Sequence, residues 1–173
     1  GTLYVGTSPY GEPSEYLYLV DTDSWTIDSL KTGKNPAYFA TDGGRIYVSC
    51  IGNSFNNIEG SIVRIENGSV VESIDLNSFP GSIEYADEGL LFATNAFYSD
   101  SVLEFNVIAL DGEDLSIEYT YGIPSASDME QFNDRIIVGT NSGEMYVIEL
   151  SALTQFISAD TDVNLKTGKI AVK

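Results

Sequence analysis

The residues that could carry chemistry are aromatic, amide and acidic side chains gathered in three irregular segments. These segments are SPYGEPSE at 8–15, IGNSFNNIE at 51–59 and NAFYSD at 95–100. Rings that stack, next to amides and carboxylates that hydrogen-bond, suit the binding of a sugar or a peptide. The predicted ligand-binding residues are Tyr10, Glu12, Asn53, Phe55, Asn56, Phe97, Tyr98 and Asp100.

The same aromatic side chains have an alternative role as packing residues. Phe55, Phe97 and Tyr98 could fold back and fill gaps between packed sheets, as large rings commonly do. Lys31, Lys34 and Asn35 would reach the same region from a neighbouring connection. The sequence therefore offers a binding surface, with core packing as its competitor.

Catalysis has little support, and no catalytic residue is assigned. The chain contains no histidine, which removes Ser-His-Asp and Cys-His machinery and the commonest general base. A pair of carboxylates could still act, as in glycoside hydrolysis, but 26 acidic residues make chance pairs plentiful. A carboxylate-dependent lyase or glycoside hydrolase stays open as the enzymatic alternative.

No cofactor or metal site is predicted, and calcium is the one metal kept as an alternative because it accepts oxygen ligands alone. Its candidate ligands are Asp21, Asp23 and Asp28 in one segment and Asp111, Glu113 and Asp114 in another. Neither group has the spacing of an EF-hand loop, and aspartate in a hairpin turn needs no metal to explain it. The lone cysteine, Cys50, allows no intrachain disulfide, and its apolar neighbours indicate a small buried side chain.

The charge of the chain narrows its partners. The 26 acidic and 8 basic residues give a net charge of −18, which repels phosphate backbones at long range, so nucleic acid is not expected as a partner. No apolar run approaches 18 residues and no basic start precedes an apolar stretch, so neither membrane insertion nor a signal peptide is expected. With 43% hydrophobic residues, the 173-residue chain can bury a core as one domain.

The elements that must position these side chains come from an internal repeat. Four similar apolar hexamers, TLYVGT, RIYVSC, LLFATN and RIIVGT, align on Leu3, Ile46, Leu91 and Ile136 with separations of 43, 45 and 45 residues. Prolines recur in step at positions 36, 80 and 124, each before an expected strand. A period in the forties with strand-like segments predicts the blades of a β-propeller.

Within each period the chain has the composition of short strands joined by turns. Asn67-Gly68 between two alternating runs predicts a tight hairpin, because both turn residues must accept a positive φ. The regular apolar positions are expected to fill the space between stacked sheets. They are Val5, Val48, Ile65, Ile74, Ile83, Val138 and Ile148. Trp25 is expected to do the same or to cover a blade edge.

The hexamers resemble degenerate copies of the Tyr-Val-Thr-Asn signature of YVTN-type propeller repeats, with Phe92-Ala93-Thr94-Asn95 nearest to it and Tyr47-Val48-Ser49-Cys50 next. The resemblance covers roughly residues 2–150. It implies an all-β propeller of four-stranded antiparallel blades and a location outside the cytoplasm, in the periplasm or on the cell surface. The predicted domain is residues 1–173, with repeats at about 2–44, 45–89, 90–134 and 135–173.

The fourth repeat is short, because 38 residues remain from Ile136 to the end of the sequence. Three interpretations stay open: a small closed ring, a fragment of a larger propeller, or a half-ring completed by a homodimer. We favour an incomplete propeller, because an open blade edge can pair with another chain. The expected function is a non-catalytic module that binds a protein, peptide or glycan, and a structural segment of a larger propeller or surface layer is the further alternative.

Overall fold

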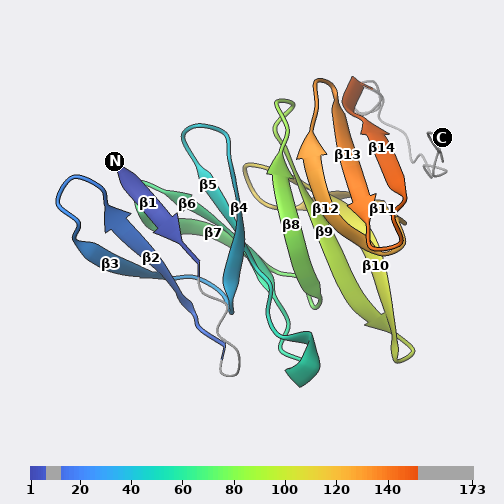
Figure 1. Cartoon of the computed structure of the whole chain (residues 1–173), viewed down its shortest axis with the longest axis horizontal. Coiled ribbons are helices and arrows are strands. Elements are labelled where there is room, and N and C mark those ends of the chain that lie inside the picture. The colour runs from blue at the N-terminus through green and yellow to red at the C-terminus, as the bar shows by residue number, and fades with distance from the viewer. Residues whose placement is uncertain (7–12, 152–173) are drawn as a thin grey trace.

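The chain folds into four antiparallel β-sheets, which confirms the predicted all-β class (Figure 1). The structure is a computed structural model that describes residues 1–6 and 13–151. Within that part of the chain, no helix has the length and apolar character needed to span a membrane.

Each sheet is built from strands that follow one another in the sequence. The first sheet contains β1 (Thr2–Val5), β2 (Tyr16–Asp21) and β3 (Ile27–Lys31). The second contains β4 (Pro36–Thr41), β5 (Ile46–Cys50), β6 (Ser61–Glu66) and β7 (Ser69–Asp75). The third contains β8 (Phe79–Tyr85), β9 (Leu90–Ser99), β10 (Val102–Asp111) and β11 (Ile117–Tyr121). The fourth contains β12 (Ala126–Gln131), β13 (Arg135–Thr140) and β14 (Met145–Glu149).

The repeated hexamers form one strand in each sheet, at the edge of the first sheet and second, after the proline-led strand, in the other three. They form β1, β5, β9 and β13, and each of these strands pairs antiparallel with the strand that follows it. The predicted hairpin at Asn67-Gly68 joins β6 to β7, with φ of 50° and 76° at its two residues. Both values lie in the left-handed region that a two-residue hairpin turn demands.

The sheets stack face to face in chain order, so three apolar layers lie between four sheets. The first layer joins sheets one and two and includes Leu17, Val48 and Ile65. The second, between sheets two and three, is built around Tyr47 and Leu110. The third lies between sheets three and four. Side chains on both faces of the two middle sheets are therefore buried, as in the blades of a propeller.

Most of the predicted core positions are buried, with two exceptions. Val48, Ile65, Ile83, Val138 and Ile148 are buried, as is the Cys50 thiol, and Ile74 is partly buried. The packing prediction was wrong for Val5, which is exposed, and for Trp25, whose side chain is 74% exposed. Val5 lies in the first sheet and Trp25 in its β2–β3 turn, and no further described sheet packs on the outward face of that sheet.

The proline-led strands β4, β8 and β12 lie side by side along one edge of the stack, where β8 contacts both of the others (Figure 1). Two ends of the stack follow from this arrangement. The loop face, at the bottom in Figure 1, carries the connections β5–β6 and β9–β10 together with the crossovers β3–β4 and β7–β8. The turn face, at the opposite end, carries the tight connections such as β6–β7 and β10–β11.

Candidate functional site

The loop between β5 and β6 is a compact structure built by asparagines. Asn53 begins a short 3-10 helix, η1 (Ser54–Asn56), and its side chain accepts a hydrogen bond of 3.2 Å from the amide of Asn56. Asn57 ends the helix in the left-handed conformation, with φ of 52°. The backbones of Asn53 and Ile58 also bond to each other in both directions. These local bonds close the loop without any apolar packing of its own.

Phe55 lies at the tip of this loop and its side chain is 100% exposed. The alternative that this ring fills a gap between sheets is therefore wrong for Phe55. Asn56 and Asn57 beside it are also exposed, whereas Asn53 is half-buried because it closes the loop. The loop thus holds an apolar ring and two amides toward solvent.

The second predicted segment, residues 95–100, differs from its expected form. Residues 95–99 continue strand β9, which pairs with β10 as far as Ser99 and Val102, and only Asp100 and Ser101 form the turn. Both turn residues have positive φ, 48° and 67°, as a two-residue hairpin requires. We call this projecting part, residues 96–105, the arm. The prediction of a loop was wrong because cross-strand pairing extends past the buried part of the sheet.

The arm carries an apolar strip on one of its faces. Tyr98 is 50% exposed, pairs across the strands with the exposed Leu103, and sets its ring edge-on against Phe79 with 5.9 Å between ring centroids. Phe97 points to the other face of the arm, opposite Glu104, and is half-buried. Sequence reasoning missed Phe79, although its position just before the repeated Pro80 placed it at the start of a strand on this face.

The arm and the β5–β6 loop meet at the crossover between β7 and β8. The amide of Gly60, at the end of the loop, donates a hydrogen bond of 2.7 Å to the carbonyl of Ser78. Ser78 is followed by Phe79, the residue whose ring contacts Tyr98. The crossover therefore places both exposed aromatic features on the loop face.

Asn35 fixes the adjacent part of the same face and is not available to a ligand. Its side chain is buried, accepts a hydrogen bond from the amide of Ser14 at 3.1 Å, and donates one to the carbonyl of Gly52 at 2.8 Å. Nearby, Lys34 and Lys31 both pair with Glu15. These two ammonium groups, Lys34 first, lower the pKa of the half-buried Glu15 carboxyl to about 2.

The predicted ligand-binding residues thus divide into three groups. Tyr10 and Glu12 lie outside the described residues. Phe55, Asn56, Tyr98 and Asp100 are exposed on the loop face. Asn53 and Phe97 are half-buried, and for Asn53 the side chain closes the β5–β6 loop.

The acidic turns considered for calcium serve other purposes in the structure. Asp21 accepts hydrogen bonds from the amides of Asp23 and Ser24, and Asp111 does the same for the two residues that follow Gly112. Glu113 pairs with Arg45 and Arg64 of the second sheet. Within residues 1–6 and 13–151, no group of three or more Asp, Glu, Cys or His side chains could hold a metal ion. Calcium therefore remains only an alternative, with no ligand set among the described residues.

One carboxyl group on the inner strands has a perturbed acidity. Burial raises the pKa of the half-buried Glu84, and the nearby charges of Glu130 and Asp128 raise it further. Asp128 also accepts a hydrogen bond of 2.8 Å from the Ser82 hydroxyl. These acidic groups lie on β8 and β12, which contact each other across the third and fourth sheets.

Comparison with known proteins identifies the architecture as that of a β-propeller. No protein-family model matches the chain, and no curated protein matches it. Among solved structures, the chain is similar to hydrazine synthase of Kuenenia stuttgartiensis, with a TM-score of 0.67 and 14% sequence identity, covering 86% of this chain and 50% of that one. It is also similar to BamB from Moraxella catarrhalis, with a TM-score of 0.61 and 14% identity over 87% of this chain and 44% of that one.

A third similar structure is the β-propeller domain of Cps50 (Swd1) from Myceliophteria thermophila. Its TM-score is 0.57 at 12% identity, covering 88% of this chain and 56% of that one. At such low identity the likeness establishes the fold alone. The chain spans about half the length of these three propeller structures. The four stacked sheets therefore correspond to part of each of these propeller structures.

Proposed function

We propose that the chain is a non-catalytic recognition module that binds a segment of another protein on its loop face. The observation that carries this proposal is the full exposure of Phe55 at the tip of a loop closed by its own hydrogen bonds. A ring that is fully exposed buries no apolar surface in the folded chain and so adds little to its stability. Such a ring, already ordered, loses little entropy when a partner covers it, which is the usual character of an interface anchor.

The apolar strip of the arm supplies a second point of contact. Tyr98 and Leu103 are exposed, and the Phe79 ring contacts the Tyr98 ring in a T-shaped arrangement. Acidic side chains surround both features, including the exposed Glu59, Asp100 and Glu104. With a net charge of −18 for the chain, the complementary partner is a segment with apolar side chains flanked by lysine or arginine.

The proposal is tested by panning phage-displayed random peptides on the immobilised wild-type chain. The site variant is Phe55→Ala, and the matched control is Phe132→Ala, which removes an exposed ring between β12 and β13, away from the loop face. We expect enriched peptides to contain apolar and basic residues together, to lose at least tenfold in affinity for Phe55→Ala, and to bind Phe132→Ala as they bind wild type.

Two results would contradict the proposal. Peptides that bind Phe55→Ala as tightly as wild type would place recognition elsewhere. A melting temperature lowered by many degrees in Phe55→Ala would make the ring a folding residue, against its exposure. A third outcome is that the chain binds oligosaccharides on an array and not peptides, and loses that binding in Phe55→Ala. That result would retain the site and identify the partner as a glycan.

Membership of the YVTN-type repeat class and a location outside the cytoplasm are part of the same proposal. The support is that the four hexamers that carry the resemblance fill equivalent strands, β1, β5, β9 and β13. Fractionation of the producing cells, with detection by antibody, would locate the protein. Recovery from the cytoplasm would overturn this location and leave the binding site unaffected.

A further inference from the structure

The turn between β2 and β3 repeats the main hydrogen bonds of the turn between β10 and β11. Each turn begins with an aspartate, Asp21 or Asp111. Its backbone carbonyl accepts a hydrogen bond from the amide four residues later, and its carboxylate accepts hydrogen bonds from the amides two and three residues later. The residue four positions after the aspartate has a left-handed backbone conformation in both turns, with φ of 58° at Trp25 and 57° at Leu115. Trp25 and Leu115 are therefore equivalent residues of two sheets.

Their surroundings are opposite. Leu115 is fully buried in the apolar layer between the second and third sheets, on the side of the sheet that precedes its own. Trp25 is 74% exposed, because its equivalent surface faces outward from the first sheet. A tryptophan held in solvent by a turn of this construction indicates a surface that another sheet covers.

The strand residues beside the two turns show the same correspondence. Strand register aligns Leu3, Val5, Tyr18 and Val20 of the first sheet with Leu91, Ala93, Ile108 and Leu110 of the third. All four residues of the third sheet are buried against the second sheet. In the first sheet Leu3 is 52% exposed, Val5 and Tyr18 are exposed, and Val20 is half-buried. The outward face of the first sheet is therefore one half of a blade interface.

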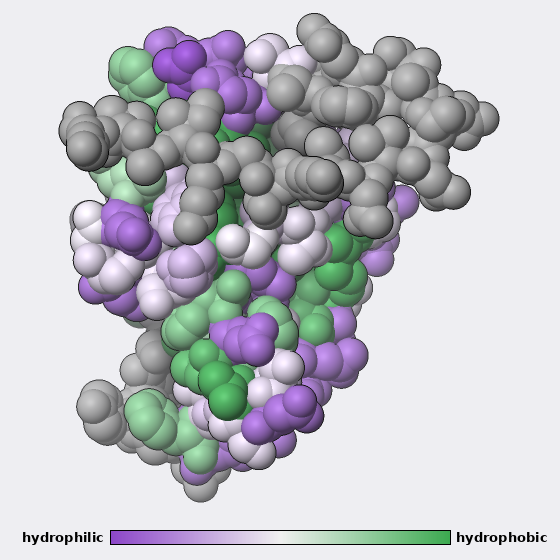
Figure 2. Space-filling view, turned by 90° about the vertical axis from the view of Figure 1, so that its right-hand side faces the viewer, coloured by the Kyte–Doolittle hydropathy of each residue, from purple (hydrophilic) through white to green (hydrophobic). Residues whose placement is uncertain are grey.

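The outward face of the fourth sheet resembles the other half. Strand register aligns Ile137 with Tyr47, and Met145 with Ile62, and both of these second-sheet residues are buried against the third sheet. Met145 is 60% exposed and Ile137 is half-buried. Figure 2 views the molecule from this end.

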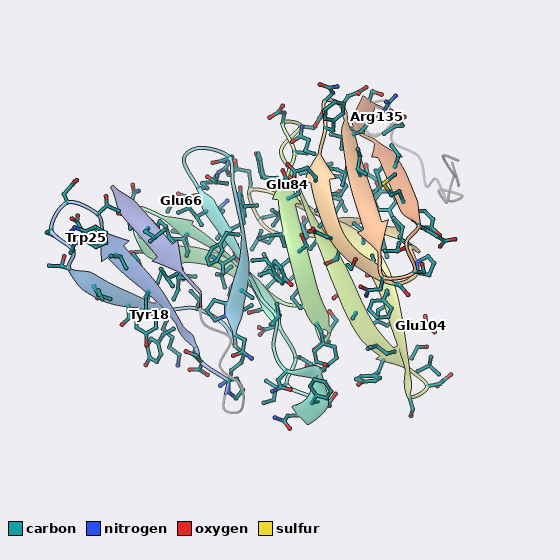
Figure 3. All side chains as sticks on the ribbon, viewed as in Figure 1. Tyr18, Trp25, Glu66, Glu84, Glu104 and Arg135 are labelled. Carbon is teal, nitrogen blue, oxygen red and sulfur yellow. The ribbon has the colours of Figure 1, made fainter. Side chains whose placement is uncertain are left out.

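Charge repeats at the rim of the two faces. Arg45, just before β5, pairs with Glu113 in the turn of the next sheet. Arg135 begins β13 at the position equivalent to Arg45; its side chain is half exposed and pairs with Glu149 of its own sheet. Asp23 occupies the position of Glu113 in the turn of the first sheet; it is exposed and pairs with the N-terminal ammonium of Gly1. Figure 3 shows Trp25 and Tyr18 at one end of the stack and Arg135 at the other.

We propose that the first sheet of one chain stacks on the fourth sheet of a second copy, and that the reciprocal contact closes a two-chain propeller ring. Each contact between the two copies adds one apolar layer of the same kind as the three layers within one chain. Arg135 of one copy then meets Asp23 of the other, as Arg45 meets Glu113 within the chain. Each copy spans about half the length of the similar propeller structures.

The test is the mass of the chain in solution, measured by light scattering coupled to gel filtration over a wide concentration range. About 0.15 M salt is needed to reduce repulsion between two chains of charge −18. We expect a mass twice that of the 18.8-kDa chain, with dissociation on dilution. A mass of one chain at every concentration, or a mass that grows beyond two copies, would overturn the proposal.

Two variants show which faces meet. Leu3→Asp places a charge on the outward face of the first sheet, and Met145→Asp does the same on the fourth; Val102→Asp, on the exposed arm, is the control. Each face variant alone is expected to be monomeric, because both contacts of a homodimer then contain the new charge. Mixing the two is expected to restore the dimer, since one of the two contacts in the mixed pair is unaltered.

The mixing experiment separates this arrangement from a like-with-like contact. If first sheets paired with first sheets, Met145→Asp alone would stay dimeric, and that result would overturn the proposal. Thermal melting of each variant by circular dichroism confirms that it is folded. If Leu3→Asp does not fold, Trp25→Asp replaces it. The Trp25 side chain is 74% exposed, so its replacement leaves the described core intact.

Discussion

The hydroxyl of Tyr47 donates a hydrogen bond of 2.9 Å to the carbonyl of Gly112, and this bond joins the second sheet to the β10–β11 turn of the third. Arg64 donates to the same carbonyl at 3.2 Å. Tyr47 is fully buried and stacks on Tyr85 with 5.3 Å between ring centroids. The contact between these two sheets is therefore directional as well as apolar.

Replacing Tyr47 by phenylalanine is expected to lower the free energy of unfolding by about 1 kcal/mol, the usual contribution of one internal hydrogen bond. The loss stays small because Arg64 continues to satisfy the Gly112 carbonyl. Urea denaturation measures it, and Tyr146→Phe, which removes a bond to Glu144 at a partly exposed site, is the control with a smaller effect. Equal losses in the two variants would contradict the role assigned to the Tyr47 bond.

The same residue predicts sensitivity to alkaline pH. Burial raises the pKa of Tyr47 to about 12, above the ordinary value of 10.0. The unfolded chain releases this proton first as pH rises, so the stability from neutral Tyr47 is fully present below pH 10 and is lost as pH approaches 12. The free energy of unfolding, measured from about pH 9 to about pH 12, should fall less steeply with pH for Tyr47→Phe than for wild type. Parallel curves would contradict the assignment.

The β5–β6 loop should be intolerant of a side chain at Gly52. A Cβ there would lie 2.2 Å from the carbonyl oxygen of Ile58, and φ is +65°. Gly68 is the matched control, because φ is +76° but no atom lies within 4 Å of its Cβ position. Gly68→Ala is expected to cost about 1 kcal/mol from the left-handed backbone alone, and Gly52→Ala roughly 1–3 kcal/mol more from the clash.

Denaturant unfolding of the two alanine variants gives the comparison. Equal costs would mean that the loop adjusts freely, and the closed loop under Phe55 would lose its support. Peptides recovered by panning should also bind Gly52→Ala more weakly than Gly68→Ala.

Glu84 is expected to reduce stability at neutral pH. Its pKa is raised by burial first and then by the charges of Glu130 and Asp128. The folded state therefore holds this proton more tightly than the unfolded chain, and stability increases as pH falls through the folded pKa. Glu84→Gln should raise the melting temperature at pH 7, with the gain shrinking as pH falls toward the ordinary carboxyl range. A lower melting temperature at pH 7 would contradict this.

The Cys50 thiol should be unreactive in the folded chain. It is fully buried, and burial raises its pKa, so little thiolate is present to react. Labelling with a thiol-specific chromogenic reagent is expected to proceed at the rate of unfolding and to become fast in denaturant. Rapid labelling without denaturant would show that the layer between the first two sheets opens locally.

Much of the fold was predictable because the repeat appears directly in the residues. The hexamers, the regularly spaced prolines and the Asn67-Gly68 turn are each recognised from local sequence. The hexamers form strands, the prolines lie at or near the start of β4, β8 and β12, and Asn67-Gly68 forms a hairpin turn. The arm was not predictable as strand, because Asp100 and Ser101 adopt positive φ without a glycine. Its pairing depends on the partner strand β10, which no local pattern reveals.

The candidate site was predictable in residue type more than in geometry. An exposed ring and a buried ring look alike in sequence, so the binding and packing roles of Phe55 could not be separated until its exposure was known. Asn35 shows the reverse, since an amide grouped with the surface residues proved to be a buried link between two loops. Trp25 is in solvent because no described sheet stacks on the outward face of the first sheet. The sequence of the first sheet alone does not reveal whether another sheet covers it.

Trp25 gives the most direct measurement of the central claim, because it is the only tryptophan of the chain and lies on the face proposed to meet a second copy. The measurement is its fluorescence emission and acrylamide quenching as the protein is diluted. If two chains close a ring, Trp25 is shielded and blue-shifted at high concentration, and becomes red-shifted and readily quenched as the ring dissociates. If emission and quenching are those of an exposed tryptophan at every concentration, no second copy covers this face and the account of a shared propeller is contradicted.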